Sequence, residues 1–98
     1  MKASWTARAE ADLYEIGDYI AVDDSVAAVA WIQRLRDRAD TVAQMPRSGR
    51  VVPEFEQEDV REVFVGIYRL VYRVRRGGID VLSVFEGGMQ MPQLDDEP

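Results

Sequence analysis

The residues best suited to chemistry are arginines that recur in a strand-like run, YRLVYRVRR, at residues 68–76. Arg69, Arg73 and Arg75 alternate with apolar side chains, which is typical of a β-strand with one face on a core and the other toward water or a partner. Residues 60–76 hold five arginines against one glutamate, a local charge of +4. Such an arginine face could bind RNA phosphates, receive the carboxylates of an acidic protein, or remain solvated.

Cleavage of RNA would be the enzymatic use of these arginines, and it also needs a general acid and a general base. The chain has no histidine and a single lysine, Lys2. Glu54 or Glu86 could serve as a base, but an unpaired glutamate is a poor acid at neutral pH and arginine stays charged. The residue types therefore favour binding over catalysis, and we assign no catalytic residue; RNA cleavage is kept as the alternative.

Composition limits the other possibilities. A chain of 98 residues with 47% apolar content suits one compact domain. The absence of cysteine excludes disulfides and a thiolate zinc site, and we expect no cofactor or metal. No apolar run approaches the roughly 20 residues of a membrane span, and the N-terminus lacks the apolar core of a signal peptide. We therefore expect a cytoplasmic protein with no membrane partner.

The net charge narrows the kind of partner. The chain carries a net charge of −6 and has a pI near 4.6, whereas nucleic-acid binders normally have a basic overall balance. We therefore expect no direct contact with nucleic acid. A basic strip on an acidic protein suits a specific acidic protein partner better than a long polyanion.

Two helices are predicted to precede the arginine region. After a short strand at residues 2–6, Thr6 is a good N-cap for a helix whose apolar residues recur at spacings of three and four. Asp24 or Ser25 is a good N-cap for a second helix, which Pro46 ends. The brief connection between the helices predicts an antiparallel hairpin. The two apolar stripes are Ala9, Leu13, Ile16 and Ile20, then Ala28, Ile32, Leu35, Ala39 and Val42.

The strands that must position the arginines follow an irregular, surface-running connection at residues 46–59. Three alternating runs separated by tight turns predict an antiparallel meander. These runs are residues 61–65, 68–74 and 79–85. The fold class is α+β: a two-helix hairpin packed on one face of a small, twisted, mostly antiparallel sheet. This domain covers residues 1–86, and the acidic residues 87–98 are predicted to be a mobile tail.

The order of these elements and residues resembles the RelE/ParE toxin superfamily, and more specifically its ParE branch. The resemblance spans about residues 3–86. The resemblance departs at residues 85–88, which read Phe-Glu-Gly-Gly, where family members often carry a histidine with basic residues. This departure bears on how strongly the chain would inhibit DNA gyrase, the target that the resemblance to the ParE branch implies. The residues that carry the resemblance are Trp5, Ala9, Asp12, Leu13, Ile16, Tyr19, Ile20, Ala27, Ala28, Trp31, Pro46, Gly49, Arg50, Pro53, Glu54, Arg61, Glu62, Tyr68, Arg69 and Tyr72.

The resemblance implies the toxin of a bacterial type II toxin–antitoxin pair, held inactive by a small ParD-like antitoxin. For the ParE branch the implied target is DNA gyrase, which the toxin would inhibit by binding. For the RelE branch, which is the alternative, the implied target is messenger RNA on the ribosome. A non-toxic adaptor domain of the same fold is a third possibility.

Five residues are predicted to contact the antitoxin. Arg61, Arg69 and Arg73 are expected to form an exposed basic strip that receives its carboxylates. Trp31 lies one position off the apolar stripe of the second helix, so we expect it at the boundary of the buried face, where an aromatic side chain suits an interface. If the arginines are only solvated, the antitoxin must rely on the helical hairpin around Trp31 and Leu35.

Overall fold

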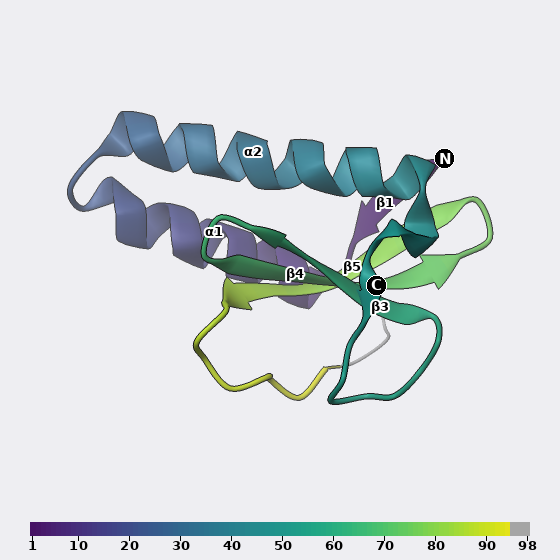
Figure 1. Ribbon diagram of the computed structural model, residues 1–98. Coiled ribbons are helices and arrows are strands. Elements are labelled where there is room, and N and C mark those ends of the chain that lie inside the picture. Colours follow the sequence, from purple (N-terminus) through teal and green to yellow (C-terminus); the bar gives the residue numbers. More distant parts are fainter. Residues whose placement is uncertain (95–98) are drawn as a thin grey trace.

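Two helices lie on one face of a five-stranded sheet in the computed structural model, which describes residues 1–94 (Figure 1). The elements are β1 (Lys2–Trp5), α1 (Ala7–Ala21), α2 (Ser25–Gln44), the 3₁₀ turn η1 (Pro46–Ser48), β2 (Arg50–Val51), β3 (Val60–Val65), β4 (Tyr68–Arg75) and β5 (Gly78–Glu86). In space the strands follow the order β1-β5-β4-β3-β2. β1 pairs parallel with β5, and the other neighbouring pairs are antiparallel. The predicted α+β class and mostly antiparallel sheet are confirmed.

Both helices begin at the N-caps that the sequence predicts. Thr6 Oγ1 accepts a hydrogen bond from the Ala9 amide at 3.1 Å, and Asp24 Oδ1 accepts one from the Ala27 amide at 3.0 Å. Pro46 begins the 3₁₀ turn that follows α2. Neither helix combines the length and apolar character needed to cross a membrane, within the residues described.

The main hydrophobic core fills the space between the helical hairpin and the sheet. Leu13, Leu35 and Tyr72 have no exposed surface there. The Tyr72 hydroxyl donates to the Pro46 carbonyl at 2.6 Å and accepts from the Gly49 amide at 3.1 Å, so its polar end is satisfied although it is buried. Gly49 is required at this contact, because a Cβ atom would collide with that hydroxyl. The segment between α2 and β2 is thereby fixed to the sheet.

The opposite face of the sheet is also covered. The loop between β2 and β3 and the chain after β5 lie on the side of the sheet away from α2 (Figure 1). A second apolar cluster on this side contains Val52, Val60, Val71, Leu82 and Phe85, with Phe55, Met91 and Leu94 packed against it. The prediction that this face of β4 is open to water or to a partner is therefore wrong.

The described part of the C-terminal segment contacts the domain. The Gly87 amide donates to the Ile67 carbonyl at 2.7 Å, and Met91 and Leu94 pack on the second cluster. These contacts do not test whether residues 87–98 are mobile, so the mobile tail after residue 86 stays a prediction. The rest of that predicted tail, residues 95–98, lies outside the described residues.

Asp12 of α1 is hydrogen-bonded to β5 beside a β-bulge between β4 and β5. The register of the two strands shifts between Val71 and Tyr72. Beside this shift, Asp12 Oδ2 accepts hydrogen bonds from the Ser83 hydroxyl at 2.6 Å and from the Val84 amide at 3.1 Å. A carboxylate of the helix is therefore bonded directly to the backbone of the central strand pair.

The connection before β3 is more ordered than the sequence predicts. It contains η1 and the two-residue strand β2, which pairs Arg50 with Glu62 and Val51 with Arg61. β2 is short, yet it places a cationic side chain directly opposite a buried carboxylate.

Candidate functional site

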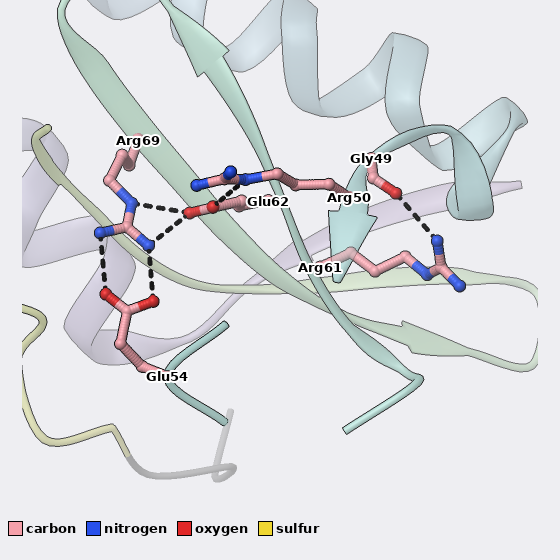
Figure 2. Close-up of polar contacts among 6 residues, drawn as sticks. All are labelled: Gly49, Arg50, Glu54, Arg61, Glu62 and Arg69. Atoms are coloured by element: carbon pink, nitrogen blue, oxygen red, sulfur yellow. Dashed lines mark hydrogen bonds and ion pairs between the residues drawn. The ribbon is translucent and has the colours of Figure 1, made fainter. Parts of the chain in front are cut away.

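A buried carboxylate, that of Glu62, lies at the centre of a polar network on the sheet face opposite the helices (Figure 2). Arg50 Nε donates to Glu62 Oε2 at 2.5 Å, and Arg69 Nε donates to Glu62 Oε1 at 2.6 Å. Glu54 binds Arg69 from the other side, because its two oxygens accept from the Arg69 terminal nitrogens at 3.1 and 3.2 Å. We refer to Arg50, Glu54, Glu62 and Arg69 as the Arg69 network.

Strand pairing brings three members of the Arg69 network together. β2 sets Arg50 opposite Glu62, and the tight turn between β3 and β4 sets Glu62 opposite Val71. Arg69 is then the diagonal cross-strand neighbour of Glu62, within reach of a long side chain. Glu54 comes from the loop after β2, so the network also joins that loop to the sheet.

The pairing determines the charge state of Arg69 and Glu54. Hydrogen bonding to Glu54, with a further contribution from Glu62, raises the pKa of Arg69 above its usual value against the opposing effect of burial. Hydrogen bonding to Arg69 lowers the pKa of Glu54 below its usual value. Both groups are therefore charged at neutral pH. Each neutralises the other.

The other two arginines of the predicted strip are also bonded within the chain. Arg61 donates to the Gly49 carbonyl at 2.9 Å (Figure 2) and to the Glu58 carboxylate at 3.0 Å. Arg73 donates to the Asp59 carboxylate at 2.8 Å, and this hydrogen bond lowers the pKa of Asp59. Both contacts fix the loop between β2 and β3 against the sheet.

The structure does not gather the three predicted arginines into one exposed strip. Arg69 and Arg73 lie on the sheet face of the second apolar cluster, whereas Arg61 is paired with Tyr72 and lies on the face of the main core. The side chains of Arg61, Arg69 and Arg73 are 12%, 8% and 12% exposed. Carboxylates between residues 54 and 62 balance their charge. No contact in the structure tests whether antitoxin carboxylates bind these arginines. That binding therefore stays a prediction.

The two predicted contact residues on α2 have different surroundings. Trp31 is half-buried, with Tyr68 edge-on at 5.4 Å between ring centroids and the Arg34 guanidinium 4.5 Å from its ring. Gly66, at φ +59°, lies against the same ring, where a Cβ would come within 2.6 Å. Leu35 has no exposed surface, because its stripe faces the sheet and lies in the main core. The expectation that Leu35 presents a surface to a partner is therefore corrected.

The Arg69 network is suited to holding the fold rather than to proton transfer. Every buried side-chain nitrogen or oxygen among the described residues has a hydrogen-bond partner. Arginine rarely exchanges protons, and the network contains no other candidate acid beside its carboxylates. Across residues 1–94, no group of three or more histidine, cysteine, aspartate or glutamate side chains is arranged to hold a metal ion.

The residue types allow surface ion pairs of Arg69 with Glu62 or with the acidic residues 53–59, but they do not predict that the pair with Glu62 is buried or that Arg50 also binds Glu62. The pairing of Glu62 with Arg69 had a usable signal, because the predicted turn at residues 66–67 sets the strand register that makes them diagonal neighbours. For Glu54 as the particular loop partner of Arg69, and for Arg50, there was no comparable signal. They lie in a segment whose residue types predict an irregular connection, which has no register.

Comparison with known protein families gives a match over most of the chain. Residues 3–91 match the family described as the ParE toxin of the type II toxin–antitoxin system parDE. The chain is also 36% identical over 91 residues to Y4kP of Sinorhizobium fredii, whose name describes it as a toxin, with 92% of each chain covered. It is 35% identical over 80 residues to Toxin RelE2 of Caulobacter vibrioides, with 82% of this chain and 88% of the relative covered.

A solved structure shows the same arrangement of helices and strands. It is that of a chromosomal ParDE toxin–antitoxin system from P. aeruginosa, with a TM-score of 0.72 and 25% sequence identity. The match covers 88% of this chain and 95% of that chain. The similarity therefore extends over nearly the whole described fold.

Proposed function

Since this chain belongs to the ParE toxin family of type II toxin–antitoxin systems, we propose that it inhibits growth by binding DNA gyrase and that a ParD-like antitoxin neutralises it. The proposal makes the chain an inhibitory binding protein rather than an enzyme. It also places the chain in the cytoplasm, where the proposed target acts.

One observation carries the choice of binding over RNA cleavage: the arginines available to hold phosphate are bonded to carboxylates of the same chain. Arg69 lies between Glu54 and Glu62, and Arg61 and Arg73 are bonded to the loop between β2 and β3. An RNA phosphate would have to displace these carboxylates, and the chain has no histidine to move a proton at the 2′-hydroxyl.

The proposed antitoxin acts by covering the domain. A small partner whose C-terminal segment folds on binding can bury a large surface of a 98-residue chain. Masking would then prevent a second large partner from binding the same domain. The solved relative supports this partner, because it is a ParDE toxin–antitoxin system.

A gyrase supercoiling assay tests the proposed target. Purified chain added to gyrase, relaxed plasmid and ATP should reduce supercoiling in a dose-dependent way, and prior mixing with the antitoxin should restore it. In cells, DNA synthesis should stop while amino-acid incorporation continues at first. Full supercoiling at every dose, or immediate loss of amino-acid incorporation with DNA synthesis intact, would contradict gyrase as the target.

RNA cleavage on the ribosome is the second candidate, because one relative of 35% identity carries the name Toxin RelE2. Primer extension on transcripts from induced cells separates the two. We expect no new transcript ends. Discrete new ends that disappear in an Arg61→Ala variant would favour the ribonuclease.

A further inference from the structure

A groove beside α1 differs in charge from the Arg69 network. It encloses about 640 Å³ and is lined by residues from 8–19, 67–68, 84–86 and 89–92. These segments are α1, the start of β4 with the turn before it, the end of β5 and the chain that follows. A groove of this size can take side chains of a partner segment. We refer to it as the α1 groove.

Carboxylates dominate the charge of the α1 groove. Asp12, Glu15 and Glu86 face one cation, Arg8, so the charged lining sums to −2 (one positive, three negative). Arg8 Nε lies 3.4 Å from Asp12 Oδ1, and the other Asp12 oxygen is bonded to β5. Glu15 and Glu86 are exposed, and their carboxylates make no ion pair or hydrogen bond with any described residue. Two negative charges of the groove are therefore uncompensated within residues 1–94.

Apolar and aromatic side chains accompany these charges. Tyr19, Ile67 and Met89 line the groove and are 80%, 59% and 60% exposed. Burial raises the pKa of Tyr68, and the charge of Glu86 raises it further, so its hydroxyl stays protonated at neutral pH. Exposed apolar side chains next to unpaired carboxylates are suited to a long cationic side chain, whose aliphatic stem packs while its charged end is paired.

We propose that the α1 groove receives a lysine or arginine side chain of the antitoxin, flanked by apolar residues that pack on Tyr19, Ile67 and Met89. This inference rests on the proposed function, which names the antitoxin as the partner that covers the domain. Glu15 and Glu86 pair with the cationic end. The occupant is a protein segment rather than a nucleic acid, because the groove and the chain as a whole are negative.

Charge complementarity places the cation on the antitoxin side of this contact. The arginines that could have received antitoxin carboxylates are bonded internally, whereas Glu15 and Glu86 are not. A partner must therefore offer positive charge to gain from the electrostatics of this surface. A flexible antitoxin segment can enter the groove with one side chain, as a folded target surface cannot easily do.

Titration calorimetry with the protein encoded by the reading frame adjacent to the toxin gene tests the inference. The variant Glu15→Gln/Glu86→Gln keeps the shape of both side chains and removes their charge. The matched control, Asp18→Asn/Asp40→Asn, removes two exposed helix carboxylates that do not line the groove. The groove variant should bind about tenfold more weakly, with a flatter dependence on salt, and the control should bind as the unmodified chain does.

A charge exchange identifies the partner residue. Each lysine or arginine of the antitoxin is changed to glutamate in turn and titrated against toxin Glu86→Lys. One such pair should recover affinity relative to either single variant. Equal binding by the groove variant and the control, or the absence of any recovering pair, would overturn the inference.

Failure of the groove inference can be distinguished from failure of the proposed function. Gyrase inhibition by the toxin alone should be the same for the groove variant and the unmodified chain. If the variant loses gyrase inhibition but binds the antitoxin normally, the groove belongs to the target and the inference is wrong. If the unmodified chain binds the antitoxin but does not inhibit gyrase, gyrase is not the target, and the inference about the groove still stands. If the unmodified chain does not bind the adjacent protein, the antitoxin assignment and the groove inference both fail.

Discussion

The Arg69 network and the α1 groove both gather carboxylates beside β4, but the carboxylates have different roles in the two regions. In the network, Glu62 has no exposed side-chain surface and is bonded to two arginines. In the groove, Glu15 and Glu86 are exposed and have no partner among residues 1–94. The comparison separates charges that hold the fold from charges that are left for a partner.

The difference also shows why a local sum of charges misleads. Residues 60–76 sum to +4, yet the carboxylates of Glu54, Glu58, Asp59 and Glu62 bind three of their five arginines, Arg61, Arg69 and Arg73. The charge that a partner meets depends on which groups are already paired. On this chain the unpaired carboxylates of the groove are more available to a charged partner than the paired arginines are.

Loss of Arg69 should have the largest effect, because it leaves a buried carboxylate with one partner fewer. We expect Arg69→Met to reduce the free energy of unfolding by about 3–5 kcal/mol, the usual cost of breaking a buried ion pair. Urea denaturation followed by circular dichroism measures this. The control Arg76→Met removes an exposed arginine and should change stability by less than about 0.5 kcal/mol. Equal losses in the two variants would show that the network does not hold the fold.

A second substitution sharpens this prediction. Changing Arg69 and Glu62 together to methionine removes the buried pair and leaves Arg50 and Glu54, which are more exposed, to the solvent. Such replacements are often nearly neutral, so the double variant should recover most of the loss of Arg69→Met. A double variant as unstable as the sum of its two single variants would contradict a direct coupling.

Asp12 lines the groove but should behave as a residue of the fold. Asp12→Ala leaves the Ser83 hydroxyl and the Val84 amide without their acceptor. Hydrogen bonds to a charged group contribute about 1.5–3 kcal/mol, so we expect a loss of that size in the free energy of unfolding. Hydrogen exchange at the Val84 amide should become faster, and Asp18→Ala should change neither quantity. Unchanged exchange at Val84 would mean that Asp12 does not anchor α1.

Local signals in the sequence predicted the helices and strands well. The N-caps at Thr6 and Asp24 and the turn between β3 and β4 each depend on residues close in the chain, and all three occur in the structure. The pairing of Glu62 with Arg69 follows from that turn. The sequence does not predict that the second face of the sheet is covered, because this depends on where an irregular loop and the end of the chain fold back.

The bulge in the central strand pair is a second reason why the site was only partly predicted. Strict alternation along residues 79–85 would place Val81 and Phe85 on the same face of the sheet. In the structure Val81 and Val84 belong to the main core, whereas Leu82 and Phe85 belong to the second cluster. The register shift opposite Val71 and Tyr72 changes the faces, and no residue type in the run indicates where it falls.

Acid should reduce the stability that the loop carboxylates contribute. Pairing with Arg69 and Arg73 lowers the pKa values of Glu54 and Asp59 below their usual values. Their contribution to stability is therefore present above the ordinary carboxyl range near pH 4 and is lost as the pH falls through the lowered values. Denaturation between pH 7 and pH 2 should show a shallower acid-induced loss in Glu54→Gln/Asp59→Asn than in the unmodified chain. An identical slope would contradict this pairing.

The smallest effect on stability should come from the groove itself. Glu15→Gln/Glu86→Gln removes two exposed charges that have no partner in the described chain, so stability should change by less than about 0.5 kcal/mol. Thermal unfolding at low and high salt measures this. A large loss would mean that these carboxylates hold the fold, and the contrast with the Arg69 network would disappear.

The most direct test of this contrast is antitoxin affinity for two variants that each lose two carboxylates. Glu15→Gln/Glu86→Gln changes the groove, and Glu54→Gln/Glu58→Gln removes internal partners of Arg69 and Arg61. We expect about tenfold weaker binding for the groove variant and unchanged binding for the loop variant, with both proteins folded at the temperature of the titration. Stronger binding by the loop variant, with unchanged binding by the groove variant, would contradict it: the released arginines would then be the antitoxin site.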